Sequence, residues 1–180
     1  MDLARTAYAK AGTVGVDSSY FALREGSSLI TQFNHVDEAH LPEVLSALRS
    51  TYTSTLTQRP MYAPAWPRVA MVSLLQENDP AEFIRFFEAS YIMGPQDFRL
   101  RLMRVWLGLR KWDELDADLR KDVRNDVEVI WNSRLQHDLA DLYFRSSFSQ
   151  RVLLRSFFAS EQDAERLRHI TQELLDQGRL

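Results

Sequence analysis

Residues 59–112 read RPMYAPAWPRVAMVSLLQENDPAEFIRFFEASYIMGPQDFRLRLMRVWLGLRKW. In this stretch Pro60 and Pro95 are 35 residues apart, and each ends one amphipathic helical pattern and precedes another. The spacing is close to the period of about 34 residues at which tetratricopeptide helix pairs stack. One helix pair buries only part of its apolar surface, so such pairs stack and their outer faces bind other molecules. The stretch predicts stacked antiparallel helix pairs and a protein that binds rather than catalyses.

Apolar residues at three- and four-residue spacing extend this helical pattern along the chain, and no period-two pattern competes with it. We therefore predict an all-α, tetratricopeptide-like fold in which antiparallel pairs form a short superhelix. One domain is expected over 1–180, with N-terminal helices in 1–58, the best repeat-like unit in 60–112 and C-terminal helices in 116–178. Helices are expected to follow the N-caps Asp37, Asp97, Asp116 and Ser160, and to occupy 18–33, 64–76, 81–93, 136–145 and 151–158.

Two glycines stand at expected helix ends. Gly94 precedes Pro95, and Gly178 follows the last apolar pattern. A glycine just beyond a helix commonly adopts a left-handed conformation, and a proline cannot continue the helix. We therefore expect a positive φ at Gly94 and a helix that Gly178 closes.

The composition excludes several classes of protein. With 45% hydrophobic and 26% charged residues, the chain has the composition of a globular protein rather than a disordered one. A net charge of -3 argues against a dedicated nucleic-acid binder. The absence of cysteine excludes disulfides and thiolate chemistry. No apolar run is long enough to span a membrane.

A set of motifs runs along this helical pattern. They are Trp66, Arg68, Val69 and Ala70, the Asp79–Pro80 turn, the Gly94–Pro95 corner, Arg104, Gly108, Leu109 and Trp112, and then Leu115, Asp116, Arg120 and Trp131. These motifs resemble a family of bacterial helical-repeat proteins that are encoded with exopolysaccharide synthesis genes. The similarity covers roughly residues 60–170. It differs at Met93, where the family usually has threonine, and over the first 58 residues, which are similar only in being helical.

This resemblance implies a tetratricopeptide-like fold and an accessory role in polysaccharide biosynthesis or export. It also implies a longer, membrane-anchored native protein, located in the periplasm or at the membrane rather than free in the cytoplasm. It implies no catalytic residues and no cofactor.

Three arginines are the candidate binding residues. Arg101 and Arg104 are neighbours on one helix face, and Arg68 lies on the first helix of the preceding unit. First helices line the inner surface of a tetratricopeptide stack, where guanidinium groups would bind a carboxylate of a peptide or an acidic sugar. The alternative is that they form ion pairs with Glu82, Glu88 or Asp97 and only stabilise the corner.

The four tryptophans have two interpretations. They lie on apolar stripes, which favours packing in the core, and the alternative is a platform on which sugar rings stack. The tryptophans are Trp66, Trp106, Trp112 and Trp131.

Other polar clusters offer no chemistry. The pair His137–Asp138 resembles metal ligands, but the other histidines (His35, His40 and His169) have no recognisable spacing. The acids Asp113, Glu114, Asp116 and Asp118 favour a helix start, where the macrodipole stabilises negative charge. No phosphate-binding loop or nucleophile turn occurs. We expect no metal site, no cofactor and no catalytic residue.

We therefore expect a non-enzymatic adaptor with one or more protein partners in polysaccharide synthesis or export. A glycan-binding or glycan-modifying protein is the alternative, and a structural domain of a larger membrane protein is a third. A hydrophobic groove rimmed by arginine would favour a protein partner, whereas exposed tryptophans beside paired carboxylates would favour a glycan.

Overall fold

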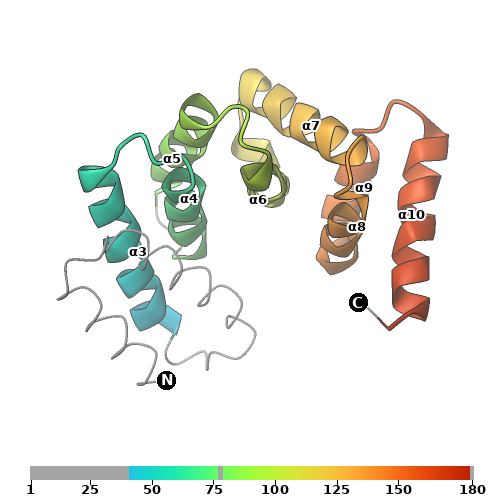
Figure 1. Ribbon diagram of the computed structural model, residues 1–180, viewed down its shortest axis with the longest axis horizontal. Helices are drawn as coiled ribbons and strands as arrows, with labels where there is room; N and C mark the ends of the chain where they lie inside the picture. Colours follow the sequence, from blue (N-terminus) through green and yellow to red (C-terminus); the bar gives the residue numbers. More distant parts are fainter. Residues whose placement is uncertain (1–40, 77–78, 179–180) are drawn as a thin grey trace. The chain divides into compact units, whose positions relative to one another are not determined.

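The computed structural model describes residues 41–76 and 79–178. Within these residues the chain forms eight α-helices and one short 3-10 helix, with no strand (Figure 1). The predicted all-α class is confirmed for this part of the chain. The helix predicted over 18–33 and the cap at Asp37 lie outside the described residues.

The helices belong to two compact units, Met1–Pro95 and Gln96–Leu180. The boundary falls at the Gly94–Pro95 corner, inside the predicted repeat-like unit 60–112. The single domain expected over 1–180 stays a prediction. The first unit contains α3 (Leu41–Gln58), α4 (Ala65–Leu75) and α5 (Pro80–Met93), and the second contains α6 (Phe98–Arg110), η3 (Trp112–Glu114), α7 (Ala117–Trp131), α8 (Gln136–Arg145), α9 (Phe148–Arg155) and α10 (Glu161–Asp176).

Helix α4 forms the centre of the first unit. It packs against α3 on one side and α5 on the other. The small residues Ala65 and Ala70 are fully buried, which allows the neighbouring helices to approach closely. Phe83 and Phe87 stack with ring centroids 5.3 Å apart, and both are buried. The predicted packing of 64–76 against 81–93 is confirmed.

The second unit packs α6 against α7 and α8 against α10. At the α6–α7 contact Gly108 allows the two helices to approach closely, because a Cβ there would lie 2.5 Å from Cγ2 of Val123. A buried cluster joins the helices of this unit; its members are Val105, Leu109, Val127, Ile130, Trp131, Leu139, Ala140, Leu142, Tyr143, Leu154, Leu167, Ile170 and Leu174.

Side-chain caps place the helix starts where the sequence predicted them. The carboxylate of Asp97 accepts a hydrogen bond from the N–H of Arg99 at 3.1 Å, and that of Asp116 from Leu119 at 2.8 Å. The Ser160 hydroxyl accepts from the N–H of Asp163 at 3.1 Å. These bonds satisfy N–H groups that have no partner within the helix.

One predicted helix range and one predicted backbone conformation are wrong. The segment predicted over 151–158 forms a helix over Phe148–Arg155, because Ser147 and Gln150 build a capping box that starts it earlier. Gly94 has φ -144° rather than a positive value. The following proline restricts the conformation of the residue before it, so the chain leaves α5 through negative φ. Gly178, which was expected to close the last helix, follows the C-cap Gln177 of α10 and has φ 64°.

Among the described residues, no helix combines the length and the apolar character needed to cross a membrane.

Candidate functional site

A pocket opens in the first unit, where the start of α3, the end of α4 and the start of α5 come together. Its volume is about 1060 Å³, slightly above the usual range for ligand pockets of about 300–1,000 Å³. The described residues that line it include five apolar ones, Leu41, Pro42, Leu45, Leu75 and Ala81, and five polar ones, Arg49, Gln76, Asp79, Glu82 and Arg85.

An ion pair forms the polar wall of this pocket. The Arg49 guanidinium donates to Glu82, and a second Arg49 nitrogen lies 3.2 Å from the side-chain oxygen of Gln76. The hydroxyl of Ser73, which is buried in α4, donates to the other Glu82 oxygen at 3.1 Å. Three helices are thus joined through the carboxylate of Glu82.

The environment of Glu82 keeps it ionised. Burial alone would raise the pKa of this carboxyl, but the hydrogen bonds from Arg49 and Ser73 and the charge of Arg49 outweigh burial, and the pKa is lowered. The wall therefore carries a fixed negative charge next to a fixed positive one at neutral pH.

Arg85 places an exposed cation at the rim of the pocket. Its side chain is 70% exposed and lies 3.9 Å from the Glu82 carboxylate, a loose contact. Exposed ion pairs of this kind contribute little to stability, so Arg85 can turn to another carboxylate at small cost. The pocket offers apolar walls to an apolar side chain and a guanidinium to an acidic one.

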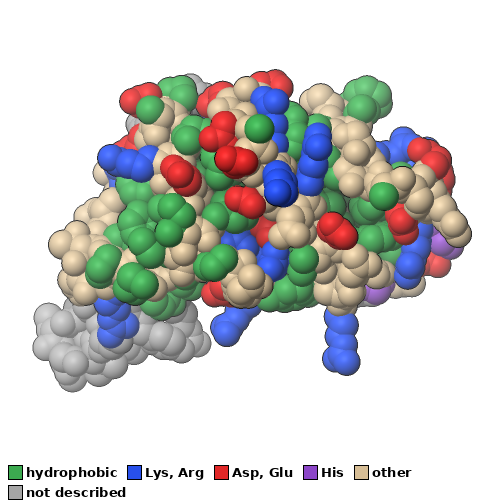
Figure 2. Space-filling view, turned by 90° about the horizontal axis from the view of Figure 1, so that it is seen from above, with side chains coloured by type: hydrophobic (Ala, Val, Ile, Leu, Met, Phe, Trp, Pro, Cys, Tyr) green, Lys and Arg blue, Asp and Glu red, His purple; other side chains and the backbone are tan. Residues whose placement is uncertain are grey.

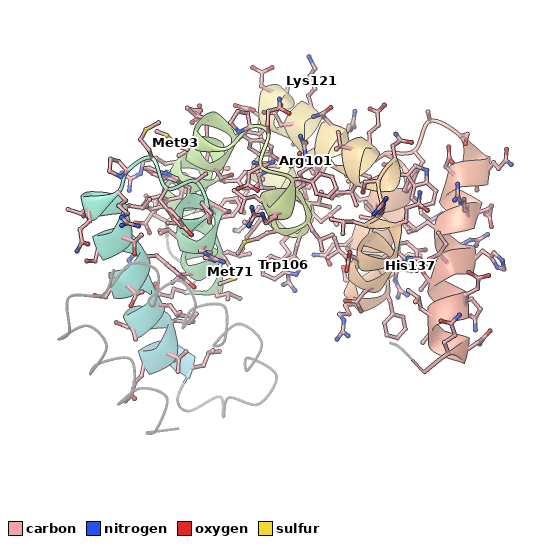
Figure 3. The ribbon with its side chains drawn as sticks, viewed as in Figure 1. Met71, Met93, Arg101, Trp106, Lys121 and His137 are labelled. Atoms are coloured by element: carbon pink, nitrogen blue, oxygen red, sulfur yellow. The ribbon has the colours of Figure 1, made fainter. Side chains whose placement is uncertain are left out.

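Arg101 and Arg104, two of the predicted binding residues, are buried in the second unit. Arg101 projects from α6 (Figure 3) and is 5% exposed, and Arg104 is 0% exposed. Both donate to the buried carboxylate of Asp126 on α7, Arg101 to Oδ1 and Arg104 through Nε to Oδ2 at 2.8 Å. They join α6 to α7, and their burial keeps them from an open groove.

Asp126, which pairs with both arginines, is not among the acids proposed from the sequence. Glu82, which is among them, pairs with Arg49 in the first unit. Asp122 lies one turn before Asp126 on α7. Burial, followed by the charge of Asp126, raises the pKa of the Asp122 carboxyl.

Arg68, the third predicted residue, lies on α4 outside the pocket. Its guanidinium carbon is 6.0 Å from the centroid of the Tyr52 ring, and its side chain is half-buried. Arg68 thus belongs to the first unit, whereas Arg101 and Arg104 belong to the second.

The tryptophans take part in packing within each unit. The indole N–H of Trp66 donates to the carbonyl of Pro60 at 2.9 Å, and Trp131 is 6% exposed with its indole N–H 3.1 Å from Asp163. Trp106, labelled in Figure 3, and Trp112 are half-buried, and each has a guanidinium over its ring. Among the described residues no tryptophan is exposed beside paired carboxylates.

The remaining polar groups form no cluster with ligand geometry. His137 and Asp138 lie exposed at the start of α8. No three His, Asp or Glu side chains in the described ranges come together as metal ligands. On the face shown in Figure 2, acidic and basic side chains are interspersed, so no single sign of charge dominates it.

Sequence reasoning missed Arg49, Glu82 and Arg85 as pocket residues. Arg49 and Glu82 are 33 residues apart, and no short-range pattern links residues at that separation. The only available signal was the turn at Asp79–Pro80, which places the start of α5 beside the end of α4.

No family model, no curated protein and no solved structure matches the chain.

Proposed function

We propose that this chain is a non-enzymatic adaptor built from tetratricopeptide-like helix pairs, and that the pocket of the first unit binds a segment of a protein partner. The observation that carries the proposal is the pocket itself, where apolar side chains lie beside Arg49 and the exposed Arg85. Apolar pockets with a few fixed polar groups are the usual form of binding sites in proteins.

The composition of the pocket favours a peptide over a sugar. Leu41, Leu45 and Leu75 offer aliphatic surface to apolar side chains, whereas a sugar ring is usually bound by stacking on an aromatic face. Arg85 would pair with a carboxylate of the bound segment, since charge-assisted hydrogen bonds to carboxylates are strong. A glycan-binding role stays the second candidate, because Trp106 and Trp112 are only half-buried.

The cellular role that we propose is accessory to bacterial exopolysaccharide biosynthesis or export. The support is the resemblance over residues 60–170, which also favours the periplasm or the membrane as the location. Arg49 and Arg85 replace Arg68, Arg101 and Arg104 as the binding arginines, because they line the pocket.

Blocking the pocket tests this proposal. Ala81 is exposed and lines the pocket in the first turn of α5, so Ala81→Trp fills part of the space without removing a core contact. Ala117 is the matched control, because it is also exposed, also lies in the first turn of a helix and belongs to the other unit. Wild type, Ala81→Trp and Ala117→Trp would each be used to capture proteins from the native host, with mass spectrometry of what is retained.

We expect a protein that wild type and Ala117→Trp retain and that is at least about tenfold depleted with Ala81→Trp. This result would support the pocket as the binding site of a protein partner. Equal retention by all three variants would contradict it. Incubation with polysaccharide provides the second arm, in which we expect no new reducing ends. If reducing ends form and their formation is lost when a carboxylate of the protein is mutated, the adaptor proposal is overturned.

A further inference from the structure

The second unit exposes apolar side chains on one face of α9. Phe148 and Val152 lie one turn apart on this helix, with 77% and 53% of their surfaces exposed. Phe144, near the end of α8, is also 37% exposed. A single exposed apolar residue is normal, but neighbours on one helix face are typical of an interaction surface. We refer to Phe148 and Val152 as the α9 stripe.

A half-buried arginine lies beside the stripe. Arg151 follows Phe148 by three residues and precedes Val152 by one, so it lies at the edge of the same face. Its Nε is shielded from solvent and has no hydrogen-bond partner among the described residues. A guanidinium in this position lacks the group that it binds best, a carboxylate.

The charged residues within the segment that carries the stripe are all arginines, and two of them pair with acids outside it. Residues 144–155 read FRSSFSQRVLLR, with three arginines and no acid. Arg145 pairs with Asp141 at 2.7 Å, and Arg155 pairs with Glu161 at 2.9 Å. Arg151 has no such ion pair within the described ranges.

We propose that the α9 stripe and Arg151 form a docking site for an acidic amphipathic helix of another protein. A helix that binds by its apolar face presents apolar side chains one turn apart, and the spacing of Phe148 and Val152 matches that of such side chains on a partner helix. A carboxylate on the flank of that helix would pair with Arg151. This site belongs to the second unit, and the proposal does not rest on the pocket of the first unit.

The charges favour a protein helix over an anionic membrane. Asp141 and Glu161 already neutralise Arg145 and Arg155, so the surface has little net positive charge to attract a layer of anionic lipids. A single cation at the edge of an apolar stripe instead suits one directed ion pair. Because Arg151 has no ion pair within 41–76 and 79–178, it favours a partner that supplies a carboxylate at a defined position.

A pair of designed helical peptides tests the proposal with the full chain. The probe has leucine on one face at three- and four-residue spacing and glutamate on its flanks, and it carries a fluorophore. The matched peptide has lysine in place of every glutamate. Fluorescence anisotropy should show at least about tenfold tighter binding of the glutamate peptide.

Two variants assign the binding to the stripe and to the arginine. Phe148→Ser with Val152→Ser should reduce affinity for the glutamate peptide by at least about tenfold, and Arg151→Gln should remove the preference for glutamate over lysine. The matched control is Met61→Ser with Ile92→Ser, which removes two apolar side chains, 75% and 65% exposed, from the first unit. The control should bind the peptide as wild type does, and all variants should keep the wild-type circular dichroism spectrum.

Several outcomes would overturn the proposal. These are equal affinity for the two peptides, no binding of the glutamate peptide to wild type, and unchanged affinity in the stripe variant. Two further measurements test other occupants of the stripe. The first is flotation with vesicles of equal parts phosphatidylcholine and phosphatidylglycerol; if flotation depends on Phe148 and Val152, the stripe binds a membrane instead. The second is analytical ultracentrifugation; if self-association depends on the same two residues, the stripe binds a second copy of the chain instead.

Discussion

Replacing Asp126 with asparagine tests the buried ion-pair cluster most sharply. The side chains of Arg101, Arg104 and Asp126 are 7%, 0% and 1% exposed, so the charges have little access to water. Asparagine keeps the shape of the side chain and removes its charge, which leaves two guanidiniums without the carboxylate they share. Removing one partner of a buried ion pair costs about 3–5 kcal/mol, because the remaining charge is buried without compensation. We expect a loss of this size in the free energy of unfolding.

The measurement is urea unfolding followed by circular dichroism. Asp141→Asn is the matched control, because Asp141 forms an exposed ion pair with Arg145 and its loss should cost no more than about 0.5 kcal/mol. In a double-mutant cycle with Arg104→Met, the two effects should be less than additive by more than about 1 kcal/mol. A loss below about 1 kcal/mol for Asp126→Asn would refute the reasoning, since the cost of burying the charges would then cancel their attraction.

Three further substitutions test the packing and the electrostatics. Phe87→Ala should lower the free energy of unfolding by about 3–5 kcal/mol, because Phe87 is fully buried and its loss leaves a cavity; a loss under about 1 kcal/mol would contradict its place in the core. Gly108→Ala should cost about 1–3 kcal/mol through its clash with Val123, and Val123→Ala in the same chain should restore part of that loss in urea unfolding. Burial and the charge of Asp126 raise the pKa of Asp122, so ionisation of Asp122 is less favourable in the folded state than in the unfolded one. Asp122→Asn should therefore raise the free energy of unfolding at pH 7 by up to about 1 kcal/mol, and this gain should disappear below the unfolded pKa of about 3.9; a gain that persists at low pH would show another cause.

Helix starts were predictable from sequence because their causes are local. The carboxylates of Asp97 and Asp116 accept hydrogen bonds from N–H groups two and three residues further on, so the relevant residues lie side by side in the sequence. The start of α9 was missed because Ser147 and Gln150 form a capping box that the apolar pattern alone did not reveal. The conformation of Gly94 was wrongly predicted because the restriction imposed by Pro95 outweighed the usual role of a glycine after a helix.

The candidate sites were less predictable because their partners are distant in sequence. Arg101 and Asp126 are 25 residues apart, and Arg49 and Glu82 are 33 residues apart. Helical spacing rules relate residues three or four apart and cannot choose among the carboxylates of other helices. The sequence could place an arginine on a helix, but burial decided whether it held two helices together or lined a pocket.

Photo-crosslinking from the pocket tests the adaptor proposal most directly. A photoreactive phenylalanine analogue at position 85 lies at the rim of the pocket, and the same group at the exposed position 121 on α7 is the control. In native host cells we predict a protein adduct that forms from position 85 and not from position 121. No adduct from position 85, an equal adduct from both positions, or a carbohydrate adduct in place of a protein would contradict a protein-binding pocket.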